Sequence, residues 1–113
     1  MIDFSSFFED LDNDSESIIL VLSAFLDEYS NCQAKINHLY KNERWSKLFM
    51  LIHSLKGMLL SLGESELVYL LDEIENACKS NKLIQKSDIA DVCLKFAKVE
   101  FQIKCELDRI SNR

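Results

Sequence analysis

Apolar residues recur at intervals of three and four along most of the chain, which is the spacing of one face of an α-helix. This pattern predicts long helices over about residues 14–41, 42–63 and 64–80, and from residue 87 to near the end of the chain. Their apolar positions are, in chain order, Ile18, Leu22, Phe25, Tyr29, Cys32, Ile36 and Leu39; Trp45, Leu48, Ile52, Leu55, Leu59 and Leu62; Leu67, Leu70, Leu71, Ile74, Ala77 and Cys78; and Ile89, Val92, Cys93, Phe96, Val99, Ile103, Leu107 and Ile110. Four such faces joined by short loops can be buried only against one another. We therefore expect an all-α protein, an antiparallel up-down-up-down four-helix bundle that forms a single domain over residues 1–113.

Polar residues and a glycine mark the ends of these helices. Asp14 and Asn42 are typical N-cap residues, and Gly63 can take the left-handed conformation that ends a helix. Near the N-terminus, a short apolar group predicts a brief amphipathic helix that covers the bundle as a lid. Its residues are Phe4, Phe7, Phe8 and Leu11. A coiled-coil oligomer is the alternative, since near-heptad spacing would also suit it, but the unequal helices favour a self-contained monomer.

The charge and hydropathy of the chain argue against several classes of function. Nineteen acidic and thirteen basic residues give a net charge of −6, without the basic stripe that binding to nucleic-acid phosphates needs. The longest uncharged apolar run covers residues 17–26, whereas a membrane-spanning helix needs about 20 residues. No basic residue precedes Lys35, so we expect no secretory signal. We expect a cytoplasmic protein, and Met1 together with the self-contained pattern favours a free-standing protein over a domain of a larger sensor.

The cysteines and histidines do not form a pattern typical of metal binding. Cys32, Cys78, Cys93 and Cys105 stand far apart, without a C-x-x-C pair, and lie in or beside predicted apolar faces. Free, buried thiols are therefore favoured over disulfides or metal ligation. Neither histidine follows a glutamate by three residues, which is the spacing of carboxylate-bridged metal bundles. We expect no bound metal.

His53 lies on the outer side of the second predicted helix. At about 100° per residue, its side chain points about 140° away from the centre of the apolar face, so it is expected to face water. Its neighbours on that outer face are Phe49, Met50 and Leu60, with Gly57 one turn away. A contiguous exposed apolar surface around an imidazole indicates a docking surface with a reactive centre, although scattered exposed apolar residues are common.

Two further residues sharpen this interpretation. His38 also points outward, but its neighbours are polar or small, so it is expected to be ordinary surface. Lys56 follows His53 by three residues and is expected to be exposed on the adjacent flank, where its ammonium could lie beside a group attached to the ring. Neutral imidazole is a nitrogen nucleophile near neutral pH, and phosphoryl transfer depends on alignment and on neutralising phosphate charge. Alternatively, Lys56 is only a solvating charge.

The segment His53-Ser54-Leu55-Lys56-Gly57, followed by Leu62-Gly63, resembles the H-x-x-K-G signature of histidine-containing phosphotransfer (HPt) domains of multistep two-component phosphorelays. The wider pattern is also similar and covers most of the chain. It includes an apolar first helix with a Phe-Leu pair, a polar turn before an aromatic residue, and a leucine and a glutamate in the third helix. These residues are Phe25, Leu26, Trp45, Leu71 and Glu75.

The resemblance implies a role for each residue of this site. His53 would accept a phosphoryl group through Nε2 from a receiver-domain aspartate and pass it to another receiver. Lys56 would steady the phosphate, and Gly57 would leave room for the receiver to approach. Glu75 would accept a hydrogen bond from Nδ1 and hold the tautomer that frees Nε2, or else be an exposed helix glutamate. Lys79, one turn further, would be a second positive charge near the phosphate.

The sequence departs from the family where small residues commonly follow the glycine. Met58, Leu59 and Leu60 are all bulky, and Leu60 lies on the outer flank, where it could restrict which receivers fit. Glu64 stands at a position that is often alanine, and its charge is favourable near a helix start. These departures bear on the choice of partner more than on the acceptor.

The resemblance also implies the partners. They are response-regulator receiver domains, typically of a hybrid sensor kinase and a downstream regulator in a bacterial system, and the Mg²⁺ ion belongs to the receiver. We expect no bound cofactor and no autokinase activity, because the chain lacks a glycine-rich nucleotide loop. Whether such a covalent carrier counts as an enzyme is left open. The alternative function is a non-catalytic interaction module that uses the same patch, made of Phe49, Met50, Leu60 and Lys79.

Overall fold

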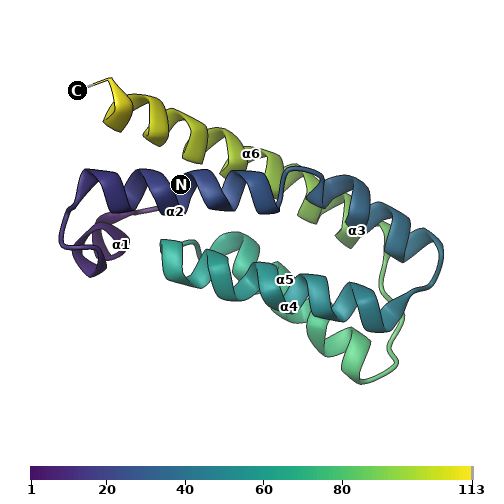
Figure 1. The fold of residues 1–113 in the computed structure, drawn as a ribbon. Coiled ribbons are helices and arrows are strands. Elements are labelled where there is room, and N and C mark those ends of the chain that lie inside the picture. The colour runs from purple at the N-terminus through teal and green to yellow at the C-terminus, as the bar shows by residue number, and fades with distance from the viewer. Residues whose placement is uncertain (113) are drawn as a thin grey trace.

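The computed structural model describes residues 1–112, and it is all-helical, as the sequence predicts. The helices, shown in Figure 1, are α1 (Ser5–Asp10), α2 (Ser15–Glu28), α3 (Cys32–Lys41), α4 (Trp45–Leu62), α5 (Glu66–Lys79) and α6 (Lys86–Ser111). Helices α4 and α5 form the most extensive pair, α6 lies along α2 and α3, and α5 also packs against α6. The molecule is elongated, with principal extents of 47, 21 and 20 Å.

The long first helix expected over residues 14–41 is two helices, α2 and α3, so this part of the prediction is wrong. The chain leaves α2 at Tyr29 and enters α3 at Cys32. Ser30 and Asn31, which lie between them, have side chains that compete for backbone hydrogen bonds and weaken a helix. Tyr29 and Cys32 are nonetheless both buried. The apolar period therefore continues across the break, and the break was invisible in that pattern.

The predicted helix ends are confirmed at two positions. Asp14 caps α2, because its carboxylate accepts a hydrogen bond from the Ser17 backbone N–H at 3.1 Å. Gly63 ends α4 in the left-handed region with φ of 88°. A Cβ atom at Gly63 would lie 2.6 Å from the Asp3 carbonyl oxygen, so glycine is required here for space as well as for its backbone conformation.

Two predicted helix starts shift by a few residues. Asn42 does not cap the next helix; it ends α3, and its N–H donates to the His38 carbonyl at 3.1 Å. Glu43 then adopts a left-handed conformation with φ of 56°, which reverses the chain before α4 begins. Glu64 lies outside α5, where its carboxylate accepts a hydrogen bond from the Val68 N–H at 2.9 Å and thereby satisfies one of the free N–H groups in the first turn of that helix.

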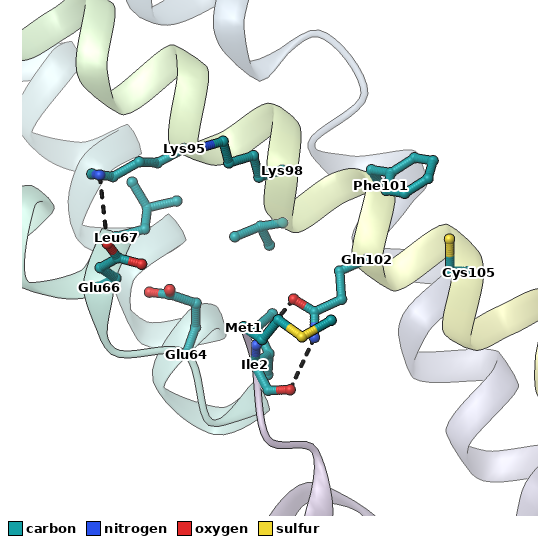
Figure 2. Close-up of a pocket in the computed structure, with 11 residues that line it drawn as sticks. Met1, Ile2, Glu64, Glu66, Leu67, Lys95, Lys98, Phe101, Gln102 and Cys105 are labelled. Atoms are coloured by element: carbon teal, nitrogen blue, oxygen red, sulfur yellow. Dashed lines mark hydrogen bonds and ion pairs between the residues drawn. The ribbon is translucent and has the colours of Figure 1, made fainter.

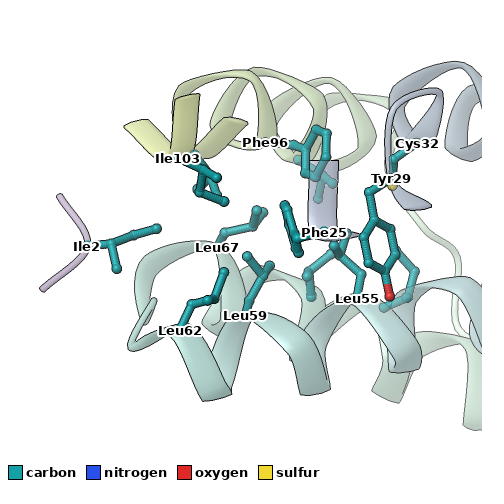
Figure 3. Close-up of a cluster of buried hydrophobic side chains, with 14 of the residues drawn as sticks. Ile2, Phe25, Tyr29, Cys32, Leu55, Leu59, Leu62, Leu67, Phe96 and Ile103 are labelled. Atoms are coloured by element: carbon teal, nitrogen blue, oxygen red, sulfur yellow. The ribbon is translucent and has the colours of Figure 1, made fainter. Parts of the chain in front are cut away.

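The core is formed by the predicted inner faces of the long helices (Figure 3). Phe25 and Phe96 meet at its centre with ring centroids 6.3 Å apart. Trp45 was expected on the inner face but is 39% exposed, because it is the first residue of α4 and lies at the edge of the core against Tyr40. The core also contains completely buried leucines and isoleucines, which include Leu22, Ile36, Leu48, Ile52, Leu55, Leu59, Leu62, Leu67 and Leu71.

The thiols are free, but only Cys32 is fully buried, and burial raises the pKa of its thiol to about 12. Cys78 and Cys93 are half-buried, and Cys105 is exposed on α6, so the expectation of four buried thiols is wrong. Cys105 lies at the edge of the predicted apolar face, where the period alone could not decide its exposure.

Residues 1–4, here called the N-terminal strap, run between the turn at Gly63 and helix α6 (Figure 2). The side-chain amide of Gln102 on α6 binds both backbone groups of Ile2, accepting from its N–H at 3.0 Å and donating to its carbonyl at 2.9 Å. Ile2 and Phe4 are buried, and the strap closes one side of a pocket of about 290 Å³. Helix α1 follows and contacts α4 through its apolar side, including the buried Phe7. Over residues 1–112, none of the helices has the length and apolar character needed to cross a membrane.

Candidate functional site

His53 lies in the middle of α4 and points away from the core. Its side chain is 64% exposed, whereas Ile52 and Leu55 on the same helix are completely buried. This is the outward orientation that the helical spacing predicts. The imidazole can therefore be reached by another macromolecule.

The inner edge of the imidazole contacts Glu75 on α5. The Nδ1 atom of His53 lies 2.9 Å from Glu75 Oε1. Glu75 is only 3% exposed, so the alternative of an exposed helix glutamate is wrong. A carboxylate can only accept a hydrogen bond, which assigns the ring proton to Nδ1 when Glu75 is ionised. The Nε2 lone pair is then the free one.

Lys56 also contacts Glu75, and it is less exposed than expected. Its side chain is 18% exposed, and Nζ lies 2.6 Å from Glu75 Oε2 and 3.1 Å from Asp72 Oδ1. The contact with Oε2 is a short ion pair, which compensates the buried carboxylate for its lost hydration. The lysine is thus held by two carboxylates of α5 rather than free in solvent.

These contacts fix the charges at neutral pH. Burial acts to raise the pKa of Glu75, but the contacts with Lys56 and His53 outweigh it, and the pKa is lowered overall. The contacts with Glu75, and then with Asp72, raise the pKa of Lys56. At neutral pH the carboxylate of Glu75 is therefore ionised, and the amine of Lys56 is protonated.

A third basic side chain approaches the same carboxylate. Lys79, one turn after Glu75 on α5, places Nζ 3.8 Å from Glu75 Oε1 and 5.6 Å from the centroid of the Phe49 ring. Phe49 in turn stacks on His53, with ring centroids 5.9 Å apart and an angle of 13° between the planes. All the polar and aromatic residues that the sequence singled out around His53 are thus brought together by α4 and α5.

The surface around the imidazole is open and partly apolar. Met50 is 69% and Leu60 is 57% exposed, as expected from their positions on the outer face of α4. A Cβ atom at Gly57 would meet no heavy atom within 4 Å in the described part of the chain. On α5, the side chain of Tyr69 is 70% exposed. These residues leave a broad face on which a partner could rest.

Sequence reasoning missed Asp72. It precedes Glu75 by three residues and so lies on the same side of α5, which is a signal that helical spacing could have given. Its contact with Lys56 could not be read from the chain, because that depends on how α4 and α5 are placed against each other.

His38 is exposed on α3, as expected. Its Nδ1 lies 3.2 Å from the neutral side-chain amide of Asn42, not from a carboxylate. Within residues 1–112, no group of three or more histidine, cysteine, aspartate or glutamate side chains is arranged to hold a metal ion.

Comparison with models of known protein families identifies the family of the chain. A family model described as Hpt domain matches residues 20–113. The match covers most of the chain, and the protein belongs to the Hpt domain family. Hpt domains carry out histidine phosphotransfer in phosphorelays and interact with receiver domains of response regulators. No curated protein and no solved structure matched the chain.

Proposed function

We propose that this protein is a phosphorelay intermediate in which Nε2 of His53 accepts a phosphoryl group from a receiver-domain aspartate and passes it to a second receiver. One observation carries the proposal. An exposed imidazole donates its Nδ1 proton to a buried, ionised glutamate, so its other nitrogen is a free nucleophile that faces solvent.

The transfer step follows from this arrangement. The Nε2 lone pair of His53 attacks the phosphorus atom of the aspartyl phosphate. An N–P bond forms while the P–O bond to the aspartate breaks, and its electron pair stays on the aspartate carboxylate. The ring retains its Nδ1 proton and gains positive charge, which the Glu75 carboxylate at 2.9 Å offsets. In the second step, a receiver carboxylate attacks phosphorus and the N–P electron pair returns to Nε2.

Lys56 and Gly57 complete the proposed site. Lys56 is already charged and is held on the same carboxylate as the imidazole, so a small rotation of its flexible stem would move Nζ towards phosphoryl oxygens. Gly57 has open space where a side chain would begin, which suits the close approach of a receiver loop. Lys79 is the candidate for a second cation, and Met50 and Leu60 are candidates for receiver docking.

The remaining parts of the proposal concern partners and topology. Phosphate would come from the receiver of a hybrid kinase, with Mg²⁺ held by the receiver, in a bacterial cytoplasm. The chain itself would need no cofactor and would act as a monomer without autokinase activity. We also infer an up-down-up-down order for the bundle, in which α2 and α3 together form the first helical segment and α4, α5 and α6 form the next three. Only short turns separate these successive segments.

The function is tested by labelling. The chain is incubated with each receiver domain of the source organism after phosphorylation by a small acyl phosphate and Mg²⁺. At least one receiver is expected to give an acid-labile, base-stable phosphate on this chain. His53→Gln should abolish the label, while His38→Gln, the matched control, should retain it.

Equal labelling of the His53→Gln variant would place the acceptor elsewhere and contradict the proposal. If receivers bind but none transfers phosphate to the wild-type chain, the protein is instead a non-catalytic interaction module.

A further inference from the structure

The imidazole of His53 is too exposed to be held by the core. With 64% of the side chain open to solvent, its orientation depends on a few contacts. Two of them involve the ring directly: the hydrogen bond from Nδ1 to Glu75 at 2.9 Å, and the near-parallel stack on Phe49 at 5.9 Å.

The hydrogen bond alone leaves the ring plane undetermined. The ring rotates about its Cβ–Cγ bond, whose torsion has broad minima, and a single hydrogen bond at Nδ1 restricts that rotation only loosely because it tolerates wide angles. The stacked Phe49 ring lies at only 13° to the imidazole plane, in the offset arrangement that aromatic pairs prefer. Phe49 stands four residues before His53, one turn away on the same helix, so the stack is built into α4.

The two supports of the imidazole are also connected to each other. The ammonium of Lys79 lies 5.6 Å from the Phe49 centroid and 3.8 Å from Glu75 Oε1. Contacts therefore run from His53 to Phe49, to Lys79, to Glu75 and back to His53. In such a closed circuit, the ring cannot tilt without disturbing a contact on its face or at its edge.

We propose that Phe49 is a positioning residue for phosphoryl transfer, which sets the plane of the His53 ring so that Nε2 points along the line of attack. This inference rests on the proposed function of His53. It assigns Phe49 a role different from the receiver docking that the sequence suggested. A docking residue changes the affinity for the receiver, whereas a positioning residue changes the rate of transfer within the complex.

The test compares Phe49→Leu with Phe49→Tyr. Leucine keeps the apolar bulk but has no aromatic face, while tyrosine keeps the face. Phe101→Leu is the control for the same substitution elsewhere, because Phe101 is an aromatic residue on the surface of α6, outside the site, whereas Phe49 is half-buried. In single-turnover transfer from a saturating phosphorylated receiver, Phe49→Leu should be about tenfold slower, with receiver Kd changed less than twofold. Phe49→Tyr should recover most of the rate that Phe49→Leu loses, because it keeps the aromatic face, and Phe101→Leu should transfer at the wild-type rate.

A spectroscopic readout separates positioning from a general loss of structure. In the free protein, the stacked Phe49 ring should displace the NMR shifts of the His53 imidazole protons. Phe49→Leu should abolish this displacement, and Phe49→Tyr should retain it. The inference is overturned if Phe49→Leu keeps the wild-type rate, if its defect lies in Kd, or if its imidazole shifts do not move. Failure of the wild-type chain to accept phosphate from any receiver would instead contradict the proposed function itself.

Discussion

Glu75 places a buried negative charge beside an exposed histidine, and three basic side chains gather around it. His53 contacts one carboxylate oxygen, Lys56 the other, and Lys79 approaches the first. A buried carboxylate is costly unless such partners compensate for lost hydration. In this site the partners are the same groups that phosphoryl transfer would use, so the stability and the chemistry of the site are linked through one residue.

This linkage predicts how stability depends on pH. The folded pKa of Glu75 lies below its ordinary value of 4.5. Its ionised form therefore stabilises the fold above about pH 4.5, and this contribution is lost as the pH falls through the folded pKa. The difference in the free energy of unfolding between wild type and Glu75→Gln should shrink from pH 6 to pH 3, by at most about 1.4 kcal/mol per pH unit. Urea unfolding at each pH measures it, and parallel pH profiles for the two proteins would contradict the account.

At the residue level, His53 could be predicted because its spacing and its neighbours are both visible along one helix. The burial of Glu75 and the pairing of Lys56 with Asp72 could not. Both depend on how α4 and α5 pack, and a charged residue at the border of an apolar face gives no sign of being covered. The resemblance to the family suggested Glu75 as the partner of Nδ1, but it did not indicate that this glutamate is buried.

At the level of elements, helices were predicted more reliably than their ends. The spacing of apolar residues predicted the helices, since burial of one face is what holds each helix in place. It could not show the break between α2 and α3, because Tyr29 and Cys32 keep the period while the backbone turns. The reversal at Glu43 was hidden for another reason. A left-handed conformation there is imposed by the tertiary fold on a residue with no special preference for it.

The two glycines at the middle and the end of α4 provide a matched pair of predictions. Gly57→Ala should stabilise the fold by about 0.5–1 kcal/mol, because the new methyl enters open space and alanine favours a helix interior. It should nevertheless slow transfer, since the methyl projects into the open face that we propose for receiver docking. Gly63→Ala should cost about 1–3 kcal/mol, because φ of 88° and the nearby Asp3 carbonyl both oppose a side chain.

Thermal unfolding and single-turnover transfer, measured on both variants, check this pair. A destabilised Gly57→Ala variant would show that the open space beside His53 is absent. An unchanged stability in Gly63→Ala would show that the contact of the N-terminal strap with this turn is not tight.

At the scale of the whole molecule, the N-terminal strap and the face around His53 lie at different places along α4. The N-terminal strap, with Ile2 and Phe4 in the core, lies across the Gly63 end of α4, ten residues from His53, or about 15 Å along the helix. The face of α4 and α5 around the histidine is left uncovered by the described chain. The class of fold and the outward histidine followed from apolar spacing, whereas the course of the strap depends on distant contacts such as Gln102 with Ile2.

The central claim concerns a single atom, and one measurement addresses it directly. The ¹⁵N-labelled chain is phosphorylated by a receiver, and the imidazole nitrogens are examined by long-range ¹H–¹⁵N and ³¹P correlation. The account predicts phosphorus bonded to Nε2 of His53, with Nδ1 still protonated against Glu75. Phosphorus on Nδ1, on His38 or on a carboxylate would contradict it.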